Sequence, residues 1–354
     1  MPGVENGLFD DKTVSLNSTM TNPDSKTTHQ MYNVRNMYGL MMAQSTHKII
    51  SDKALPIGDR RPLVYSQSTF SAASGSVSAH IAAPVARSWD WLRYSVASVL
   101  NMNILGVPMS GVDVCGTTGT QDAQLCAYWY QLAVFQPIAR NHYLTTDKNP
   151  ANEPYLVTDA PSAALIRTAM YDRLRVMRYM YTEFFKVTLK GGAFVKPMFF
   201  NFPADPDALR DVEQDFMVGE YVKVSPLLTK PAGATPSYSS YFPTAKGEAW
   251  VNLFNLSDLQ STVPDATDAK EADKKFQRNS INAGDHVNAY LMPGAIIPMQ
   301  GLTYQTVDPT TKKTVTKTAK TSNEMMQQIP VDLVLNMNAN EEARGDIFVD
   351  DGYS

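Results

Sequence analysis

The chain has 354 residues, of which 44% are hydrophobic, and its 31 basic and 35 acidic residues leave a formal net charge of -4. This length allows two or three domains with real hydrophobic cores. The charges are nearly balanced and form no cluster of Lys and Arg, which excludes nucleic acid as an expected partner. No stretch approaches the roughly 18 apolar residues of a membrane-spanning helix. The opening residues, MPGVENGLFDD, have neither the basic start nor the apolar centre of a signal peptide.

The first hundred residues predict a polar loop, a helix, two strands and a second helix. Residues 1–30 are polar and aperiodic, which is typical of a loop. Apolar residues at helical spacing predict a helix over 32–50, and we interpret its methionines as core. His47, near the end of this helix, is expected to cap or pack rather than to bind a metal. Two short apolar runs, 63–65 and 79–83, predict strands joined by a Ser/Gly/Ala-rich loop, and a helix follows over 88–100.

The next hundred residues continue this alternation of short strands and helices. Residues 104–109 predict a buried strand that leads into the glycine-punctuated loop SGVDVCGTTGT. A helix is expected over 122–135, then the short segment QPIARNHY, and a long amphipathic helix over about 163–189. Short apolar strands that alternate with helices favour a parallel α/β arrangement, of which the chain contains about four units.

Beyond Gly191-Gly192 the pattern changes to short runs rich in β-branched and aromatic residues, which predict an antiparallel β region. The polar stretches 257–282 and 306–323 are expected to be exposed excursions. The runs are FVKPMFFNF, EYVKVSPLL, SYSSYF, EAWVNLFNL, HVNAYLM and GAIIPM.

The two cysteines, Cys115 and Cys126, lie eleven residues apart, a spacing that matches no common zinc pattern. From the spacing alone, a disulfide and two buried thiols both remain open. Two sequons, at Asn17 and Asn255, would carry glycans only in a secreted or lumenal protein.

Nine motifs in order resemble the second half of a family 31 glycoside hydrolase, the α-glucosidase group. The resemblance implies an α/β plus β fold: the second half of a (β/α)8 TIM barrel over 1–192, then C-terminal antiparallel β-sandwich domains. The proximal β domain would span 193–300, and the distal one would begin over 301–354. The motifs are YNVRNMYGLMMA, RPLVYSQSTF, GVPMSGVDVCG, AYWYQLAVFQPIARNH, NEPY, KPMFFNFPAD, VSPLL, GAIIPMQ and ARGDIFVDDG.

The family's catalytic residues are not found at the matching positions. Its mechanism uses a carboxylate nucleophile and a second carboxyl group as acid/base, roughly 5 Å apart. The nucleophile's W-x-D-M-N-E type motif is absent, so we expect the sequence to begin past it and past the first four strands. Alignment on His80 and Trp89 places Pro84 at the acid/base position, Ile81 at a Trp position and Gln67 at a sugar-contacting Arg position. The resemblance therefore predicts no catalytic residue in this chain.

Other positions of the family pocket are retained. Asp113, Arg140 and His142 match residues that surround the sugar in the family, and Gln67 could still hydrogen-bond a hydroxyl group. These residues would either order the loops or contact sugar, and we favour the first interpretation because the pocket has lost its other groups. Cys115 and Cys126 match a family pair that forms a disulfide, so the resemblance implies the same here.

The remaining carboxylates in the matched motifs have simpler explanations. Asp90 is interpreted as a first-turn acid of a helix and Glu153 as part of the family's NEPY loop. Asp350 is interpreted as part of a turn in the β region.

Half a barrel leaves two unpaired sheet edges and an exposed apolar interior. We therefore expect a companion: a polypeptide that carries the first four βα units, the rest of a longer precursor, or a second copy of this chain. One hypothesis is an inactive structural or glycan-contacting subunit, which would contact an α-glucan or oligosaccharide. The other is part of an active retaining α-glucosidase whose partner carries the nucleophile. No cofactor or metal is expected, and the resemblance implies a lumenal, lysosomal or secreted location.

Overall fold

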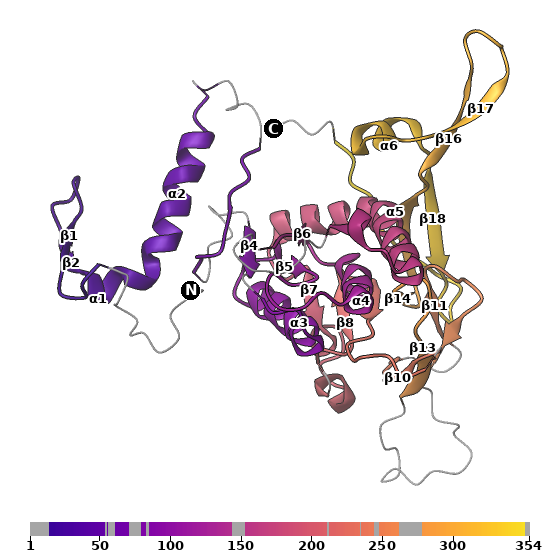
Figure 1. The fold of residues 1–354 in the computed structure, drawn as a ribbon, viewed down its shortest axis with the longest axis horizontal. Coiled ribbons are helices and arrows are strands. Elements are labelled where there is room, and N and C mark those ends of the chain that lie inside the picture. Colours follow the sequence, from indigo (N-terminus) through magenta and orange to yellow (C-terminus); the bar gives the residue numbers. More distant parts are fainter. Residues whose placement is uncertain are drawn as a thin grey trace.

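The computed structural model in Figure 1 has a helix-rich part followed by a β-rich part. It describes residues 14–53, 55, 61–70, 79–82, 85–143, 153–210, 212–233, 235–243, 248–261 and 278–350.

The helix-rich part contains a parallel sheet whose four described strands follow one another in chain order. They are β3 (Tyr65–Ser66), β4 (Ala79–Ala82), β5 (Ser110–Val114) and β6 (Ile138–Asn141). Every neighbouring pair is parallel. The predicted parallel arrangement of about four units is confirmed.

The third strand does not lie where the sequence predicted it. Residues 104–109 form no strand, because Ile104 ends helix α3 (Trp89–Ile104). The strand is β5, and all five of its residues are buried. The backbones of β5 and β6 approach closely at Gly111, where a Cβ atom would lie 2.2 Å from the carbonyl oxygen of Ile138 on β6. A glycine at this position allows the approach but interrupts the run of apolar side chains by which a strand is recognised in a sequence.

Three helices pack around this sheet, and each begins at a residue whose side chain caps it. Besides α3 they are α4 (Ala123–Ala133) and α5 (Ala160–Lys190). The side chains of Ser88, Asp122 and Asp159 accept hydrogen bonds from the backbone amides of Trp91, Leu125 and Ser162. The core between them contains fully buried Trp129, Phe135 and Tyr179.

The residues before this sheet contain more structure than the sequence predicted. A two-stranded hairpin, β1 (Thr19–Thr21) with β2 (Thr28–Gln30), lies in the segment expected to be a loop. The expected helix over 32–50 is divided into α1 (Met31–Val34), a 3-10 turn (Arg35–Met37) and α2 (Tyr38–Ile50).

Helix α2 stands apart from α3, α4 and α5 in Figure 1 and contacts the sheet region only along a narrow face. Leu40 and Ala43 pack against Val107, but Met41 and Met42 are 49% and 60% exposed. The interpretation of the methionines as core was therefore wrong within this chain.

The β-rich part is built on a six-stranded antiparallel sheet in the order β12-β11-β14-β9-β8-β7. Its core contains fully buried Trp250, Tyr290 and Phe242. The strands of this sheet are β7 (Val195–Pro197), β8 (Phe216–Val218), β9 (Val222–Ser225), β11 (Trp250–Asn252), β12 (Leu259–Gln260) and β14 (Asn288–Leu291).

Three strand pairs surround this sheet. The polar stretch 306–323, expected to be an exposed excursion, contributes to a hairpin that projects from the body in Figure 1. The pairs are β10 (Ser237–Ser240) with β13 (Asn279–Asn282), β15 (Ala295–Gln300) with β18 (Val331–Asn336), and β16 (Thr303–Val307) with β17 (Thr314–Thr318). Helix α6 (Ser322–Gln328) lies between β17 and β18.

The last described residues return to helix α5. The Nζ atom of Lys186 lies 3.0 Å from a carboxylate oxygen of Asp346, and Phe348 stacks on Phe185. Asp350 accepts hydrogen bonds from the hydroxyl of Tyr181 at 2.8 and 2.9 Å and pairs with Arg61. The turn expected at Asp350 continues into residues outside the described ones and stays a prediction, whereas the Asp350 side chain joins segments far apart in the chain.

Candidate functional site

The candidate site lies where the parallel strands end, and its centre is an ion pair between β5 and β6. Asp113 and Arg140 are register partners on these neighbouring strands. The Nε and Nη2 atoms of Arg140 donate to the two carboxylate oxygens of Asp113 at 2.6 and 2.9 Å. The Asp113 side chain is fully buried, and that of Arg140 is 29% exposed. Hydrogen bonding to Asp113 raises the pKa of the Arg140 guanidinium group. The two side chains are therefore held in a fixed, bidentate geometry.

A second contact joins β4 to the segment after β3. The Nδ1 atom of His80 lies 3.0 Å from the hydroxyl of Thr69. Burial lowers the pKa of His80 below its usual value of 6.5, which keeps the imidazole neutral at pH 7. Ile81 is buried and Gln67, just after β3, is exposed. His80 therefore joins two strand ends rather than supplying charge.

The loops that follow β4 and β5 are bonded to each other. The amide of Thr117 donates to the carbonyl of Val85 at 2.8 Å, and the hydroxyl of Thr117 accepts from the amide of Val85 at 2.9 Å. The Arg87 amide donates to the carbonyl of Thr118 at 2.7 Å. Gly116 has a φ of 73°, and a Cβ atom there would lie 2.9 Å from the Arg87 amide nitrogen. Only glycine fits this junction without strain.

Cys115, directly after β5, is bonded to Cys126 on α4, with their Cα atoms 4.5 Å apart. The side-chain amide of Asn141 at the end of β6 donates to the hydroxyl of Tyr130 on the same helix at 3.2 Å. Helix α4 is thus tied to the ends of β5 and β6.

Reduction of this disulfide is expected to destabilise the protein by about 3 kcal/mol, because a link across a separation of 11 residues restricts the unfolded chain. Urea unfolding with and without a thiol reductant measures the difference. A variant with both Cys115→Ala and Cys126→Ala is the control, since reductant should leave its midpoint unchanged. An unchanged midpoint for the unmodified protein would contradict the expectation.

The other expected site residues are not gathered at the ion pair. His142 is exposed just beyond β6. Asn17 and Asn255 are both exposed, which leaves their side chains accessible. Pro84 lies outside the described residues. Asp90 lies in the first turn of α3, as expected.

Two further observations concern the described part of the chain. It contains no group of three or more His, Cys, Asp or Glu residues arranged to hold a metal ion. None of its helices combines the length and the apolar character needed to cross a membrane.

Sequence reasoning missed the partners that fix this site. Neither Thr69, Thr117 nor Tyr130 was singled out, because a hydroxyl group that bonds across strands has no local sequence signal. The Asp113 to Arg140 pair did have one: opposite charges at the ends of consecutive parallel strands. Chemically, this arrangement holds the ends of β5 and β6 in register and places both carboxylate oxygens of Asp113 against Arg140.

The chain matches two family models in succession. The model of the glycosyl hydrolases family 31 TIM-barrel domain matches residues 5–183, and that of the family 31 C-terminal domain matches residues 191–297. Lysosomal alpha-glucosidase of Mus musculus is 33% identical over 362 residues, a match that covers 100% of this chain and 34% of the relative. The probable maltase-glucoamylase 2 of Homo sapiens is 26% identical, with 97% of this chain and 12% of the relative covered. The chain thus spans about a third of the length of the lysosomal relative.

Solved structures resemble the fold. The glucosidase II alpha subunit in its Tris-bound crystal structure has a TM-score of 0.76 at 24% identity, covering 92% of this chain and 31% of that one. A Flavobacterium johnsoniae dextranase in complex with glucose has a TM-score of 0.73 at 18% identity, covering 92% and 36%. A glucosidase II heterodimeric complex, made of a catalytic subunit and the binding domain of a regulatory subunit, has a TM-score of 0.75 at 24% identity, covering 92% and 31%.

Proposed function

We propose, since this chain belongs to glycosyl hydrolase family 31, that it forms the second half of an α-glucosidase-like barrel in a non-catalytic role, as a structural or glycan-contacting unit. One observation carries the proposal. Asp113 is the only acidic residue in the four described parallel strands, and it is buried with both carboxylate oxygens bound to Arg140.

Glycoside hydrolysis by retention needs two carboxyl groups about 5 Å apart, one as nucleophile and one as acid/base. Asp113 is suited to neither role. Both of its carboxylate oxygens accept hydrogen bonds from Arg140, and its burial keeps these oxygens from a sugar carbon. Pro84, at the position that the family resemblance gives to the acid/base, has no titratable group. The role that suits Asp113 is to hold β5 and β6 together.

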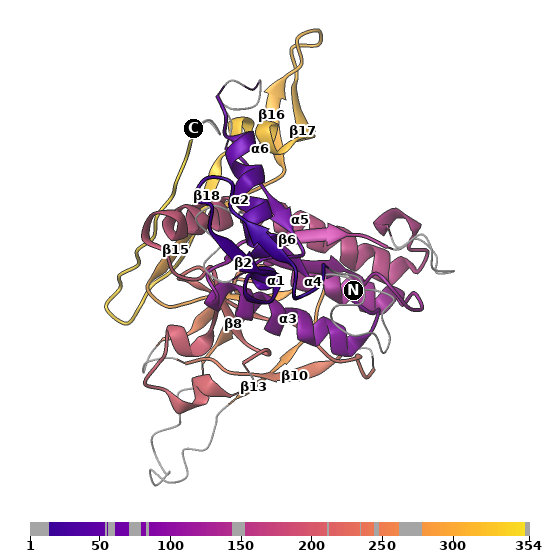
Figure 2. The same cartoon turned by 90° about the vertical axis from the view of Figure 1, so that its left-hand side faces the viewer.

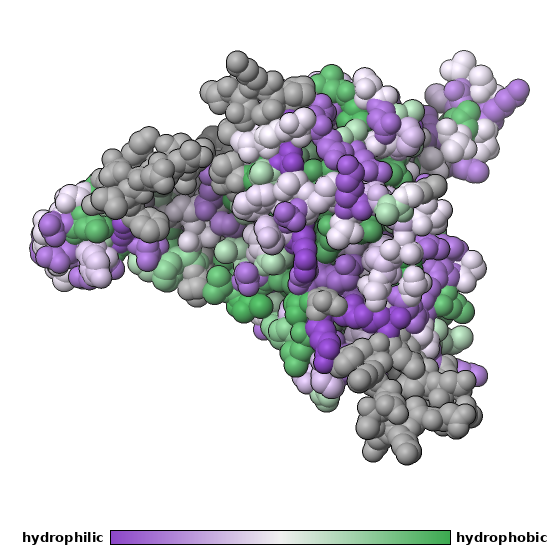
Figure 3. Space-filling view, turned by 60° about the horizontal axis from the view of Figure 1, so that its bottom comes forward, coloured by the Kyte–Doolittle hydropathy of each residue, from purple (hydrophilic) through white to green (hydrophobic). Residues whose placement is uncertain are grey.

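We further propose that a companion covers the open half of the barrel: a polypeptide with the first four βα units, the rest of a longer precursor, or a second copy of this chain. Within the described sheet, β3 and β6 are edge strands, and parallel sheets are almost always covered on both faces. Large apolar side chains near this opening are exposed. Figure 3 shows apolar surface that continues from the part of the molecule projecting to the left onto its main body. On α2 and around β3 these residues are Tyr38, Met41, Met42, Ile49, Leu63, Tyr65 and Phe70. Figure 2, with the left-hand side of Figure 1 facing the viewer, shows α2 and the β1-β2 hairpin in front of the rest of the molecule.

A lumenal, lysosomal or secreted location fits the same proposal. Three relatives at 31–33% identity, from Mus musculus, Rattus norvegicus and Bos taurus, are lysosomal alpha-glucosidases. The Cys115 to Cys126 disulfide is of a kind that persists in oxidising compartments. The exposed sequon residues Asn17 and Asn255 would be accessible to glycosylation there.

A second candidate function is part of an active retaining α-glucosidase whose companion carries the nucleophile. Exposure of His142 at the end of β6 favours it, since that side chain is free to meet a sugar hydroxyl. This function would also need an acid/base from outside the four described strands, which is why we rank it second.

The test is an assay of the native assembly, with its polypeptides identified by native mass spectrometry, on maltose and on an aryl α-glucoside. We expect no turnover of maltose above background, because the alkoxide leaving group of maltose requires a proton that no residue here supplies. Turnover near the usual enzymatic range of about 1–1,000 per second would contradict the proposal.

A Pro84→Asp variant of the same assembly separates the causes of inactivity. Activity that appears only in this variant supports the proposal and shows that the acid/base was the missing group. Equal activity before and after the substitution would favour the second candidate function.

A further inference from the structure

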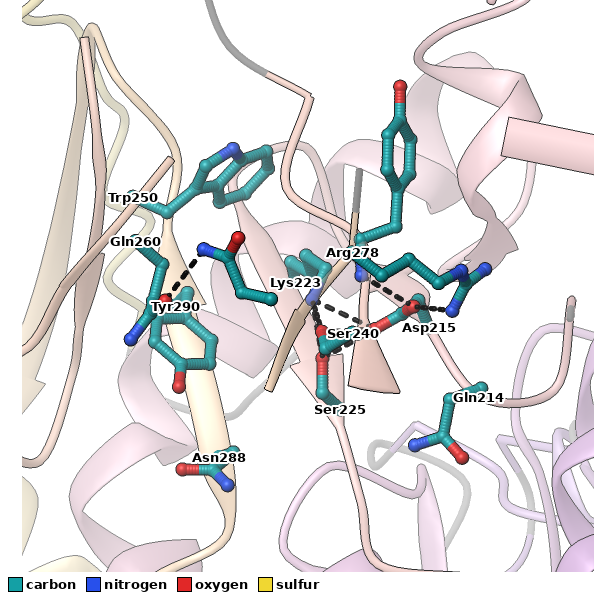
Figure 4. A network of polar contacts seen from close by, with 12 residues as sticks. Gln214, Asp215, Lys223, Ser225, Ser240, Trp250, Gln260, Arg278, Asn288 and Tyr290 are labelled. Carbon is teal, nitrogen blue, oxygen red and sulfur yellow. Dashed lines mark hydrogen bonds and ion pairs between the residues drawn. The ribbon is translucent and has the colours of Figure 1, made fainter. Parts of the chain in front are cut away.

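We propose that a polar pocket in the β-rich part is a binding site for a neutral oligosaccharide. This goes beyond the proposed function, which concerns the barrel half. The pocket lies between strands β11, β12, β13 and β14 and has a volume of about 390 Å³. That volume is within the range of sites that enclose small ligands. Figure 4 shows Gln260, Asn288 and Tyr290, three of its lining residues, close to one another.

The lining is dominated by groups that hydrogen-bond hydroxyls. Besides the carboxylates of Asp258 and Asp285, it contains five amide side chains and two hydroxyl groups, and none of the lining residues is Lys or Arg. The amide and hydroxyl residues are Asn252, Asn255, Gln260, Asn282, Asn288, Ser280 and Tyr290.

The floor of the pocket is held rigid by Asp258. Its carboxylate accepts hydrogen bonds from Gln260 Nε2 at 2.6 Å, from Asn252 Nδ2 at 3.0 Å and from the hydroxyl of Tyr290 at 3.3 Å. Tyr290 is fully buried, and the Nζ atom of Lys223 lies 5.5 Å from its ring centroid on the other side. A floor fixed before binding loses little conformational entropy on binding.

The rim of the pocket is anchored to two helices of the barrel half. Gln131 on α4 donates to the carbonyl oxygens of Gly284 and Asp285 at 2.9 and 3.2 Å. The Nδ1 atom of His286 lies 2.6 Å from a carboxylate oxygen of buried Asp172 on α5. The His286 ring also stacks on Phe254, at 5.1 Å between centroids. This rim is therefore positioned by the barrel half rather than left as a free loop.

Three polar residues at the opening keep bonding capacity for a ligand. Ser280, Asn282 and Asp285 are exposed. Among the residues that the structure describes, none bonds the side chains of Asn282 or Asp285. A carboxylate and an amide at one opening can hold adjacent sugar hydroxyls, because ionised acceptors form the stronger hydrogen bonds.

The same chemistry separates a sugar from other ligands. Two carboxylates without Lys or Arg in the lining disfavour phosphate and other anions. A divalent cation needs several charged oxygen ligands, and the described residues contain no such cluster here. Phe254 and Ile281 add a small apolar surface, which suits the C–H face of a sugar ring and is too small for a lipid.

The experiment is titration of the assembly with maltotriose, followed by calorimetry and ligand-observed NMR, on protein made in a host that attaches no N-glycans, so that Asn255 is unmodified. We expect Asp285→Asn to weaken maltotriose binding about tenfold or more, because the hydrogen bond that is lost involves a charged acceptor. Asn282→Ala is expected to weaken it in the same direction, and neither exposed substitution should alter the fold.

The matched control is Asp332→Asn, which makes the same charge change at an exposed residue of β18 outside the pocket. It should leave the affinity unchanged. Equal affinity in Asp285→Asn, Asn282→Ala and the unmodified assembly would overturn the site, as would the absence of any binding. If maltotriose bound to the barrel half or to a companion instead, its affinity would be the same in these variants and in the unmodified assembly. That result would overturn the pocket as a binding site and would leave the proposed function of the barrel half unaffected.

Discussion

Arg140→Ala is expected to lower the free energy of unfolding by about 3–5 kcal/mol. The substitution leaves the carboxylate of Asp113 buried without the one charged partner that the described residues give it, and an uncompensated buried charge costs that much. The loss would spread through the strand ends, since β5 also carries the bonded loop and the disulfide. Urea unfolding followed by tryptophan fluorescence measures it, since Trp129 lies buried in this core.

A double variant distinguishes an unpaired charge from a simple loss of packing. Arg140→Met combined with Asp113→Leu removes both charges and keeps apolar volume, so it should recover most of the lost stability. A loss below about 1 kcal/mol for Arg140→Ala alone would mean that the pair behaves as a surface salt bridge. Equal instability of the single and double variants would also contradict our explanation.

Asp215→Ala is expected to lower the free energy of unfolding by a similar amount, about 3–5 kcal/mol, in the β-rich part. Figure 4 shows Asp215 beside Lys223, Ser225 and Ser240. Asp215 is buried and accepts from Ser225 and Ser240 at 2.7 Å each, and Lys223 Nζ lies 2.9 Å away. Arg278 adds a contact at 3.2 Å. Without this carboxylate, fully buried Lys223 has no anionic partner. The midpoint of urea unfolding measures the effect.

The stability of the β-rich part is expected to depend on pH through Lys223. Burial lowers the pKa of Lys223 below 10.5, so the unfolded chain binds more protons between the folded-state pKa and 10.5. The contribution of Lys223 to the free energy of unfolding therefore rises with pH between its folded-state pKa and 10.5, and it is lower at pH values below that range. Removing Asp215 takes away an interaction that raises this pKa, so the window should widen toward neutral pH. Lys223→Met, as control, should abolish this part of the slope. An unchanged slope in both variants would contradict the assignment.

The order of helices and strands could be predicted from the sequence because the spacing of apolar residues follows the buried face of each element. The helices α3, α4 and α5 and six strands of the β-rich part, β7, β9, β10, β11, β14 and β15, lie within a few residues of their expected positions. Strand β5 could not be found this way, since Gly111 replaces an apolar side chain where two backbones meet. The exposure of Met41 and Met42 on α2 could not be predicted from the spacing of apolar residues either. That spacing indicates which face of a helix is apolar, but it does not indicate what covers this face.

The candidate site was only partly predictable. The motifs identified the family correctly and singled out Asp113, Arg140 and His142 as positions of the family pocket. They could not show that Arg140 occupies both oxygens of Asp113, since that depends on the register of β5 and β6. The bonded loops around Thr117 were hidden for the same reason. The roles of Pro84 and Gln67 stay predictions.

The contact of Asp350 with Arg61 bears on the order in which the chain folds. The two residues are 289 positions apart, and closing a loop of that length costs about 5 kcal/mol in chain entropy. An ion pair that is 47% exposed on the arginine side returns far less than that. We therefore expect the contact to form after α5 and its neighbours have packed. During synthesis, the face of α5 around Tyr181 and Phe185 stays without these contacts until residues 346–350 have been made. Such late closure favours slow folding and gives chaperones a defined surface to protect.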